Sequence, residues 1–186
     1  MTSLQIKYAA LDELAAHEEN PKAHDVAQIA EAIRRFGFID PVIVDERTGK
    51  LAAGHGRLAA LTLYRDRWEA EVDGWTDPPQ GIRVKGKVWS VPRVVGYSSA
   101  SDDEARAALV ALNRTTELGG WDEEALLPIL QALAEGEYGL DGVGYDPSDL
   151  DALERRLADV TPPDDFPDVD LETNTACPKC GYEWSE

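Results

Sequence analysis

Residues 37–61 read GFIDPVIVDERTGKLAAGHGRLAAL, and this stretch decides the fold. Pro41 introduces a β-branched run, and the RTGK sequence at 47–50 predicts a hairpin turn into a second short strand. That strand ends on the glycines of GHGR, residues 54–57, and leucines at helical spacing follow at once. The stretch therefore predicts two antiparallel strands that run directly into a helix.

The segment before this unit predicts a short strand and then a helix. Alternating apolar residues near 4–10 favour the strand, and Asn20-Pro21 marks a turn after it. Asp25 is placed to cap the helix, and Gly37 stands where the helix would end. Apolar residues share one face of the expected helix 25–36: Val26, Ile29, Ile33 and Phe36.

The segment after the unit predicts one more strand and three helices. Residues 69–90 mix Gly, Pro and charge, which favours a loop or a small hairpin insertion. Residues 91–98, VPRVVGYS, predict a strand. Ser101, with Glu104 three residues on, forms a capping box that starts a helix. Two further helices are expected over residues 122–136 and 146–159.

The composition fits one compact domain with a tail. The chain has 186 residues, of which 43% are hydrophobic and 29% charged, as is typical of globular proteins. No apolar run approaches the roughly 18 residues that a membrane span needs, and the N-terminus lacks the features of a signal peptide. We therefore expect a soluble, cytoplasmic protein with no membrane partner.

The net charge of −18 is concentrated in the last third of the chain. Residues 1–120 carry 15 basic and 18 acidic side chains, whereas residues 121–186 carry 3 and 18. Because DNA affinity depends on Lys and Arg contacts with phosphates, so acidic a segment opposes duplex binding. It indicates a solubilising surface, a basic partner, or competition with nucleic acid for a basic patch. Any contact with DNA is expected to be indirect or through a partner protein.

The GHGR motif has the chemistry of a phosphate site. Gly54, His55 and Gly56 lie at a strand-to-helix junction, where backbone N–H groups point out at the positive end of the helix dipole. Arg57, one turn into the helix, offers a guanidinium that can bind phosphate in a bidentate manner. The alternative is a tight turn that carries a surface arginine.

The CPKCG sequence near the end of the chain has the form of a zinc knuckle. Cys177 and Cys180 are the only cysteines, so they supply two of the four ligands of a tetrahedral zinc site. The other two ligands would come from the same pair of a second chain, as a dimer clamp, or from within the chain. The alternatives are a redox-active dithiol or a ribbon without metal. The candidate ligands within the chain are His17, His24 and His55.

Four segments, taken in this order, resemble the ParB/sulfiredoxin superfamily, and within it the short ParB-like N-terminal-domain proteins of phages and mobile elements. The resemblance covers roughly residues 4–135 and implies an α+β fold: a small mixed sheet with flanking helices, C-terminal helices, an acidic linker and a CPxCG tail. The segments that carry it are HEENPK (17–22), residues 37–61, residues 91–115 and CPKCG (177–181). The expected divisions are a nucleotide-binding domain at 1–120, a helical extension at 121–159, an acidic Pro-rich linker at 160–176 and the knuckle tail at 177–186.

The resemblance implies a nucleoside triphosphate bound with Mg²⁺. In ParB proteins the matching motif ends in an arginine at the position of Arg57, but it has a Glu-Arg pair where this chain has His55 and Gly56. CTP specificity is therefore not carried over. An Asn and an Arg that reach the triphosphate and Mg²⁺ match Asn113 and Arg114. The full implied set is Asn20, Pro21, Lys22, Gly54, His55, Gly56, Arg57, Asn113 and Arg114.

One departure from the ParB pattern bears on metal binding at Asn113. The ParB pattern has an acidic residue before the matching Asn, where this chain has Leu112. The alternative role for Asn113 and Thr115 is capping of the helix C-terminus.

Two enzymatic relatives of the fold fit the sequence less well. Sulfiredoxins carry their catalytic cysteine at the position of His55, so sulfinic-acid repair is excluded. The GHxR form also resembles archaeal free-serine kinases, which have a His-Glu pair comparable to His17-Glu18 but an Asp where this chain has Ala53. That resemblance implies Glu18 or Glu19 as a general base, and the alternative is a solvated loop carboxylate.

The sequence thus predicts a nucleotide-binding module of phage or mobile-element type that acts in DNA metabolism or modification through a partner. A homodimer is compatible with this role. The alternative is a small kinase or nucleotidase that uses the same pocket, so whether the chain is an enzyme stays open. A third hypothesis is an interaction protein whose acidic tail binds a basic partner. Residues 136–186 are too short and too acidic for the DNA-binding and dimerisation domains of partitioning ParB proteins.

Overall fold

The computed structural model of the chain describes residues 3–158 and 175–184. Within these ranges the main sheet has the strand order β1-β5-β2-β3, with β4 also paired to β5. Strand β5 runs parallel to β2 and antiparallel to β1 and β4, and β2 and β3 form an antiparallel hairpin. The strands are β1 (Gln5–Ala10), β2 (Val42–Asp45), β3 (Leu51–Ala53), β4 (Arg83–Lys85) and β5 (Val88–Tyr97). The expected small mixed sheet is confirmed.

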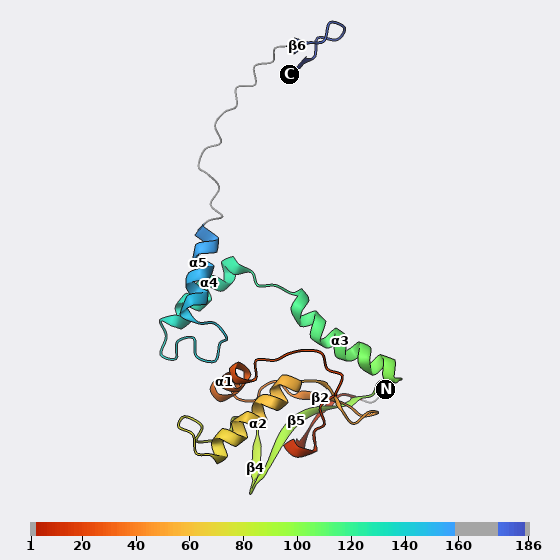
Figure 1. The fold of residues 1–186 in the computed structure, drawn as a ribbon, viewed down its shortest axis with the longest axis vertical. Coiled ribbons are helices and arrows are strands. Elements are labelled where there is room, and N and C mark those ends of the chain that lie inside the picture. The colour runs from red at the N-terminus through yellow and green to blue at the C-terminus, as the bar shows by residue number, and fades with distance from the viewer. Residues whose placement is uncertain (1–2, 159–174, 185–186) are drawn as a thin grey trace.

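Helices pack on this sheet and continue beyond it, so the α+β fold class is confirmed. Helices α1 and α2 lie side by side against the sheet, and α3 leads from its edge toward the α4–α5 pair (Figure 1). The helices are α1 (Val26–Phe36), α2 (His55–Glu69), α3 (Asp102–Leu118), α4 (Glu123–Ala134) and α5 (Pro147–Ala158), with a 3-10 turn η1 (Leu11–Glu13) after β1. Among the described residues, no helix is long and apolar enough to cross a membrane.

The core lies between the sheet and helices α1 and α2. Its largest fully buried side chains in this region are Trp89, Leu51, Leu61, Val42 and Val91. The 69–90 insertion contributes to this core, because Trp75 is 5% exposed and packs edge-on against Tyr64 with ring centroids 4.6 Å apart. The insertion also includes β4, so the small hairpin expected there is present.

Two helix starts follow the sequence signals, with one difference of detail. The Asp25 carboxylate accepts a hydrogen bond from the Gln28 N–H at 2.9 Å, and α1 ends at Gly37, which has a φ of +85°. In α3, the Ser101 hydroxyl accepts from the Glu104 N–H at 3.1 Å. In a capping box the Glu104 carboxylate would accept from the Ser101 N–H. Here it accepts from the Ala100 N–H, one residue earlier.

Helix α3 extends beyond Asn113 and Thr115. It continues to Leu118, so Asn113 and Thr115 lie inside the helix and not at its C-terminal cap. The Thr115 hydroxyl donates to the Ala111 carbonyl at 2.9 Å, one turn back, so its hydrogen-bonding capacity is satisfied within the helix. The reading of Asn113 and Thr115 as helix caps is therefore wrong, and Gly119 takes the C-cap position.

The helical extension contacts the first domain through α1. The Arg35 guanidinium donates to the Gly139 carbonyl at 3.1 Å and to the Asp141 carbonyl, and it also lies over the Tyr138 ring. Gly142 lies close to the α1 backbone, since a Cβ there would be 3.0 Å from the Glu31 carbonyl oxygen. These contacts tie the loop between α4 and α5 to α1. Most of the predicted linker, residues 160–174, lies outside the described residues.

Candidate functional site

A cavity of about 370 Å³ opens at the start of α2, where the GHGR motif lies. Gly54 is the N-cap and has a left-handed φ of +97°. The first helical hydrogen bond runs from the Leu58 N–H to the Gly54 carbonyl, so the three preceding N–H groups have no partner in the helix ladder. The cavity is lined by Lys22, His24, Ile29, Asp40, Ile43, Ala53, Gly54, His55, Gly56, Arg57, Leu112, Asn113 and Thr116. The junction thus has amides outside the helix ladder, of the kind that an anion site uses.

Both glycines of the motif are required by close packing. A Cβ on Gly54 would lie 2.7 Å from Val42 Cγ1, and a Cβ on Gly56 would lie 2.7 Å from His24 Cγ. Any side chain at either position would push the helix start away from β2 or from the loop before α1. The glycines therefore bring the α2 N-terminus close to both neighbours.

Arg57 lies in the cavity but is not free. Its guanidinium forms an ion pair with Asp40 at 2.5 Å and donates to the Pro41 carbonyl at 3.2 Å. Its Nε is buried and has no hydrogen-bond partner among the described residues. Burial lowers the pKa of Arg57, although Asp40 acts in the opposite direction. The guanidinium thus binds the Asp40 carboxylate and the Pro41 carbonyl, while its buried Nε donor has no partner among the described residues.

The three histidines gather around the same junction. The His17 backbone N–H donates to His55 Nε2 at 3.1 Å, which makes Nε2 an acceptor and places the ring proton of neutral His55 on Nδ1. The Asn20 amide nitrogen lies 3.5 Å from His24 Nε2. Burial lowers the pKa of both His24 and His55, with neighbouring positive groups adding to the effect. Both rings are therefore neutral near pH 7 and can act as neutral donors or acceptors.

Helix α3 closes the other side of the cavity. Asn113 Nδ2 donates to Asn20 Oδ1 at 2.9 Å and to the Leu109 carbonyl at 3.0 Å. The Lys22 ammonium donates to the Thr116 hydroxyl at 3.2 Å. These contacts fix the loop before α1 against α3, so two segments far apart in sequence form one wall of the site.

The structure brings together most, but not all, of the residues implied for nucleotide binding. Lys22, Gly54, His55, Gly56, Arg57 and Asn113 line the cavity, and Asn20 is bonded to Asn113. Pro21 is exposed in the loop before α1. Arg114 is outside the lining, with a side chain that is 60% exposed and paired with Glu117 at 3.3 Å. Asp40, His24 and Thr116 were not assigned a nucleotide role from the sequence, because only the tertiary fold places them here.

The two candidate general bases are outside the lining of this cavity, and both carry ion pairs. Glu18 contacts the Lys50 ammonium at 2.5 Å, and Glu19 contacts the Arg106 guanidinium at 2.9 Å. The hydrogen bonds from Lys50 and Arg106 lower the pKa of the respective carboxylates. A lowered pKa makes each carboxylate a weaker base. Glu19 also lines a smaller cavity of about 180 Å³.

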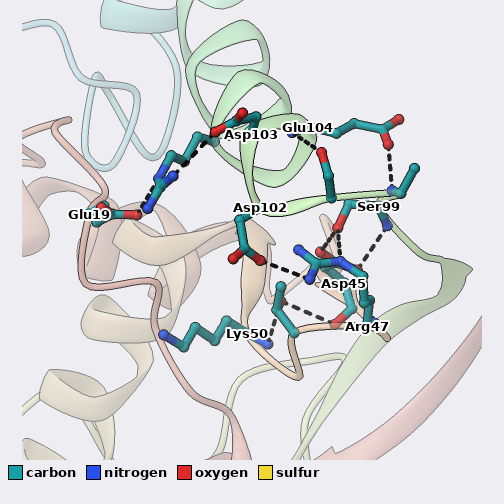
Figure 2. Close-up of polar contacts among 12 residues, drawn as sticks. Glu19, Asp45, Arg47, Lys50, Ser99, Asp102, Asp103 and Glu104 are labelled. Carbon is teal, nitrogen blue, oxygen red and sulfur yellow. Dashed lines mark hydrogen bonds and ion pairs between the residues drawn. The ribbon is translucent and has the colours of Figure 1, made fainter.

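A buried polar network positions the start of α3 (Figure 2). Asp45, 2% exposed, accepts from the Ser99 N–H at 3.0 Å and from the Ser99 hydroxyl at 2.5 Å. Arg47 Nε donates to the same hydroxyl at 2.9 Å, and Arg47 Nη1 donates to Asp102 at 2.8 Å. Burial alone would raise the pKa of Asp45, but hydrogen bonds from Ser99, Arg47 and Thr48 outweigh it and lower the pKa. The network joins the β2–β3 turn to α3, which forms one wall of the site.

The cysteine pair is separate from this cavity. Cys177 and Cys180 are free thiols in a turn between β6 (Thr175–Ala176) and β7 (Glu183–Trp184). Across residues 3–158 and 175–184, no three His, Cys, Asp or Glu side chains gather in a way that could hold a metal ion. Among the described residues no further metal-ligating side chain joins the two thiols, and the zinc half site stays a prediction.

Comparison with known proteins gives two matches. The chain is 40% identical over 65 residues to the ParB-like nuclease domain-containing protein YnaK of Escherichia coli (strain K12), which covers 33% of this chain and 74% of that protein. The structure of the present chain is similar to that of the C-terminally truncated chromosome-partitioning protein ParB from Caulobacter crescentus, complexed with CTP-gamma-S. The TM-score is 0.53 at 17% identity, over 83% of this chain and 79% of that one. No family model matches the chain.

Proposed function

The chain belongs to the ParB-like superfamily, and from this premise we propose that it is a nucleotide-binding module whose ligand phosphates lie at the start of α2. The observation that carries the proposal is the buried, unpaired Nε of Arg57 beside amides that precede the α2 hydrogen-bond ladder. Unpaired buried donors are costly, and a phosphate oxygen is a strong acceptor for them. The solved relative with a similar fold is complexed with CTP-gamma-S, which supports the ligand class.

Mg²⁺ fits this site as a companion of the nucleotide. Among the lining residues Asp40 is the one carboxylate, and it is paired with Arg57. Mg²⁺ prefers an octahedral oxygen shell and often keeps several waters beside substrate phosphates. The amide oxygen of Asn113 offers a neutral ligand at the cavity wall. We therefore expect Mg²⁺ to bind with the nucleotide phosphates and not to the free protein.

The test is isothermal titration of the full chain with CTP, ATP, ADP and GTP, each with and without Mg²⁺. We expect at least one triphosphate to bind, more tightly with Mg²⁺, and Lys22→Ala to weaken binding because it removes a cation from the cavity. Arg114→Ala is the matched comparison, since Arg114 lies outside the lining. An equal loss of nucleotide affinity in both variants would place the phosphates elsewhere on α3. If no nucleotide binds the full chain, the proposal is refuted.

A second candidate function, phosphate transfer or hydrolysis, is favoured by a small cavity that Glu19 lines together with His17, whose backbone N–H donates to His55 in the main cavity. An acceptor hydroxyl there would meet a carboxylate next to the nucleotide site. Turnover of a labelled triphosphate, compared between the wild-type chain and Glu19→Gln, separates an enzyme from a binding module. Turnover that disappears in Glu19→Gln while binding persists would favour the enzyme.

We propose further that the module, of phage or mobile-element type, serves DNA metabolism or modification through a partner protein. The net charge of −18 opposes direct duplex binding, and several basic side chains already contact acids, such as Arg65 with Asp12 and Arg67 with Glu31. Fluorescence anisotropy should show weak duplex binding by the full chain at about 150 mM salt. Salt-resistant, sub-micromolar binding would contradict the partner-dependent role.

A further inference from the structure

The last described segment, residues 175–184, is a β-hairpin whose turn carries both cysteines. Strands β6 and β7 pair antiparallel, with Thr175 opposite Trp184. The Cys177 N–H donates to the Tyr182 carbonyl at 2.8 Å, and the Gly181 N–H donates to the Cys177 carbonyl at 2.9 Å. Gly181 has a φ of +76°, which L side chains rarely adopt, so the turn depends on this glycine.

The turn arranges the two thiols for a shared ion. Cys177 and Cys180 stand three positions apart in this turn, which is the spacing of a zinc knuckle. Cys180 is exposed and Cys177 is half-buried, so neither residue is enclosed by the described chain. Zinc in structural sites takes four ligands in a tetrahedron, and thiolates are preferred among them. One hairpin provides two.

The three histidines of the chain are poorly placed to complete the set. His55 Nε2 accepts from the His17 N–H, and His17 Nδ1 accepts from the Glu19 N–H at 3.3 Å. His24 packs against Gly56 and lies within 3.5 Å of Asn20 through Nε2. Recruiting these rings to zinc would break contacts that shape the candidate nucleotide site. No third ligand joins the cysteines within the described residues.

We propose that one zinc ion is held between two copies of this chain, with Cys177 and Cys180 of each copy as its four ligands. Each copy carries half of a tetrahedral site, so the site is incomplete without the second copy. Binding releases the four thiol protons to solvent and leaves a Zn(Cys)₄ centre of charge −2, with no change in oxidation state. The assembly does not depend on the nucleotide site.

Charge sets how this dimer should respond to salt. Lys179 lies in the turn beside the thiolates and offsets part of the local negative charge. Residues 121–186 carry 3 basic and 18 acidic side chains in each copy, so the two segments repel. Because the screening length shrinks from about 8 Å at 0.15 M salt to about 3 Å at 1 M, the repulsion weakens as salt is added. We expect the zinc dimer to become tighter with rising salt.

The test measures zinc content and molar mass together on the full chain, purified with zinc and without nucleotide. We expect one zinc for two chains, a doubled mass by light scattering, a return to monomer on addition of a zinc chelator, and recovery of the dimer when zinc is restored. Cobalt in place of zinc should give the visible absorption of a tetrahedral thiolate site. Cys177→Ser with Cys180→Ser should remove zinc and halve the mass, whereas Lys179→Ala, which leaves the cysteines in place, should retain both.

Several results would overturn the proposal. One zinc per monomer would place the remaining ligands within one chain. A zinc-free monomer with reduced or disulfide-bonded cysteines would indicate a redox pair or an inert ribbon. A dimer that persists in the double cysteine variant would arise from another surface. Circular dichroism of the double variant confirms that the first domain stays folded, so loss of the dimer is not loss of the fold.

Discussion

Replacing Arg57 and its partner Asp40 separately tests whether the α2 junction binds phosphate. Arg57→Ala removes a guanidinium that contacts Asp40 and the Pro41 carbonyl and that has a buried, unpaired Nε. If that Nε donates to a ligand phosphate, the variant loses a charge-assisted hydrogen bond worth about 1.5–3 kcal/mol. Because 1.4 kcal/mol corresponds to about a tenfold change, we expect Kd to rise about 10- to 150-fold.

The opposite change is expected for Asp40→Asn. The Arg57–Asp40 pair is partly exposed, with side chains 29% and 65% accessible, and such a pair contributes about 0.2–1 kcal/mol. A ligand phosphate that takes the guanidinium must displace this carboxylate. Removing the carboxylate charge should therefore tighten nucleotide binding, by about 1.4- to fivefold from that pair energy.

Stability without ligand should change little in Arg57→Ala. The variant loses the ion pair and a hydrogen bond of about 0.5–1.5 kcal/mol, but it also removes an unpaired buried donor that costs about 1–3 kcal/mol. Titration calorimetry gives the two Kd values, and chemical denaturation gives the free energy of unfolding. The phosphate role is refuted if both variants weaken binding alike, because that pattern would mean that the ion pair only supports the loop.

Three further predictions concern the packing, protonation and docking of the domain. Gly56→Ala places a Cβ 2.7 Å from His24 Cγ, and we expect a loss of about 1–3 kcal/mol in denaturant unfolding. Burial lowers the pKa of His55 in the folded protein. As the pH falls, the unfolded chain therefore binds a proton at His55 more readily than the folded chain does, and the free energy of unfolding should fall below about pH 6.5. His55→Gln, which keeps an acceptor for the His17 N–H, should flatten that pH dependence, and an unchanged slope would contradict the assignment. Arg35→Ala removes donors to the Gly139 and Asp141 carbonyls and should speed hydrogen exchange in residues 136–146. Matched exposed controls are Gly120→Ala and Arg155→Ala, which we expect to behave as the wild type.

The ends of α1 and the strand–turn–strand–helix unit after it were predictable because each depends on neighbours in sequence. Asp25 caps α1 through the Gln28 N–H three residues on, and Gly37 stops it with a left-handed backbone. Gly54 ends β3 and starts α2 in the same way. Such signals act over a few residues, so no knowledge of the tertiary fold is needed to read them.

The partners of the site residues were not predictable, because they come from distant segments. The Asp40 carboxylate that occupies Arg57 lies 17 positions away, and Asn113 reaches Asn20 from α3 across 93 positions. The buried Asp45–Ser99 contact spans 54 positions. A charged residue in a loop reads as solvated surface unless the fold that buries it is known.

If the proposed nucleotide binds at Arg57, the geometry of that side chain makes binding an exchange of anions. In the free protein Asp40 and the Pro41 carbonyl already satisfy two nitrogens of the guanidinium, and the third is left unpaired. A phosphate would therefore gain one new donor, and it would compete with Asp40 for one of the other two nitrogens and with the Pro41 carbonyl for the last. Such an exchange gives a smaller binding free energy than binding to a guanidinium that has no carboxylate partner. The displaced Asp40 carboxylate would have to turn toward solvent. The segment around Asp40 and Pro41 should then move when ligand binds, which couples the α2 junction to the start of β2 at Val42.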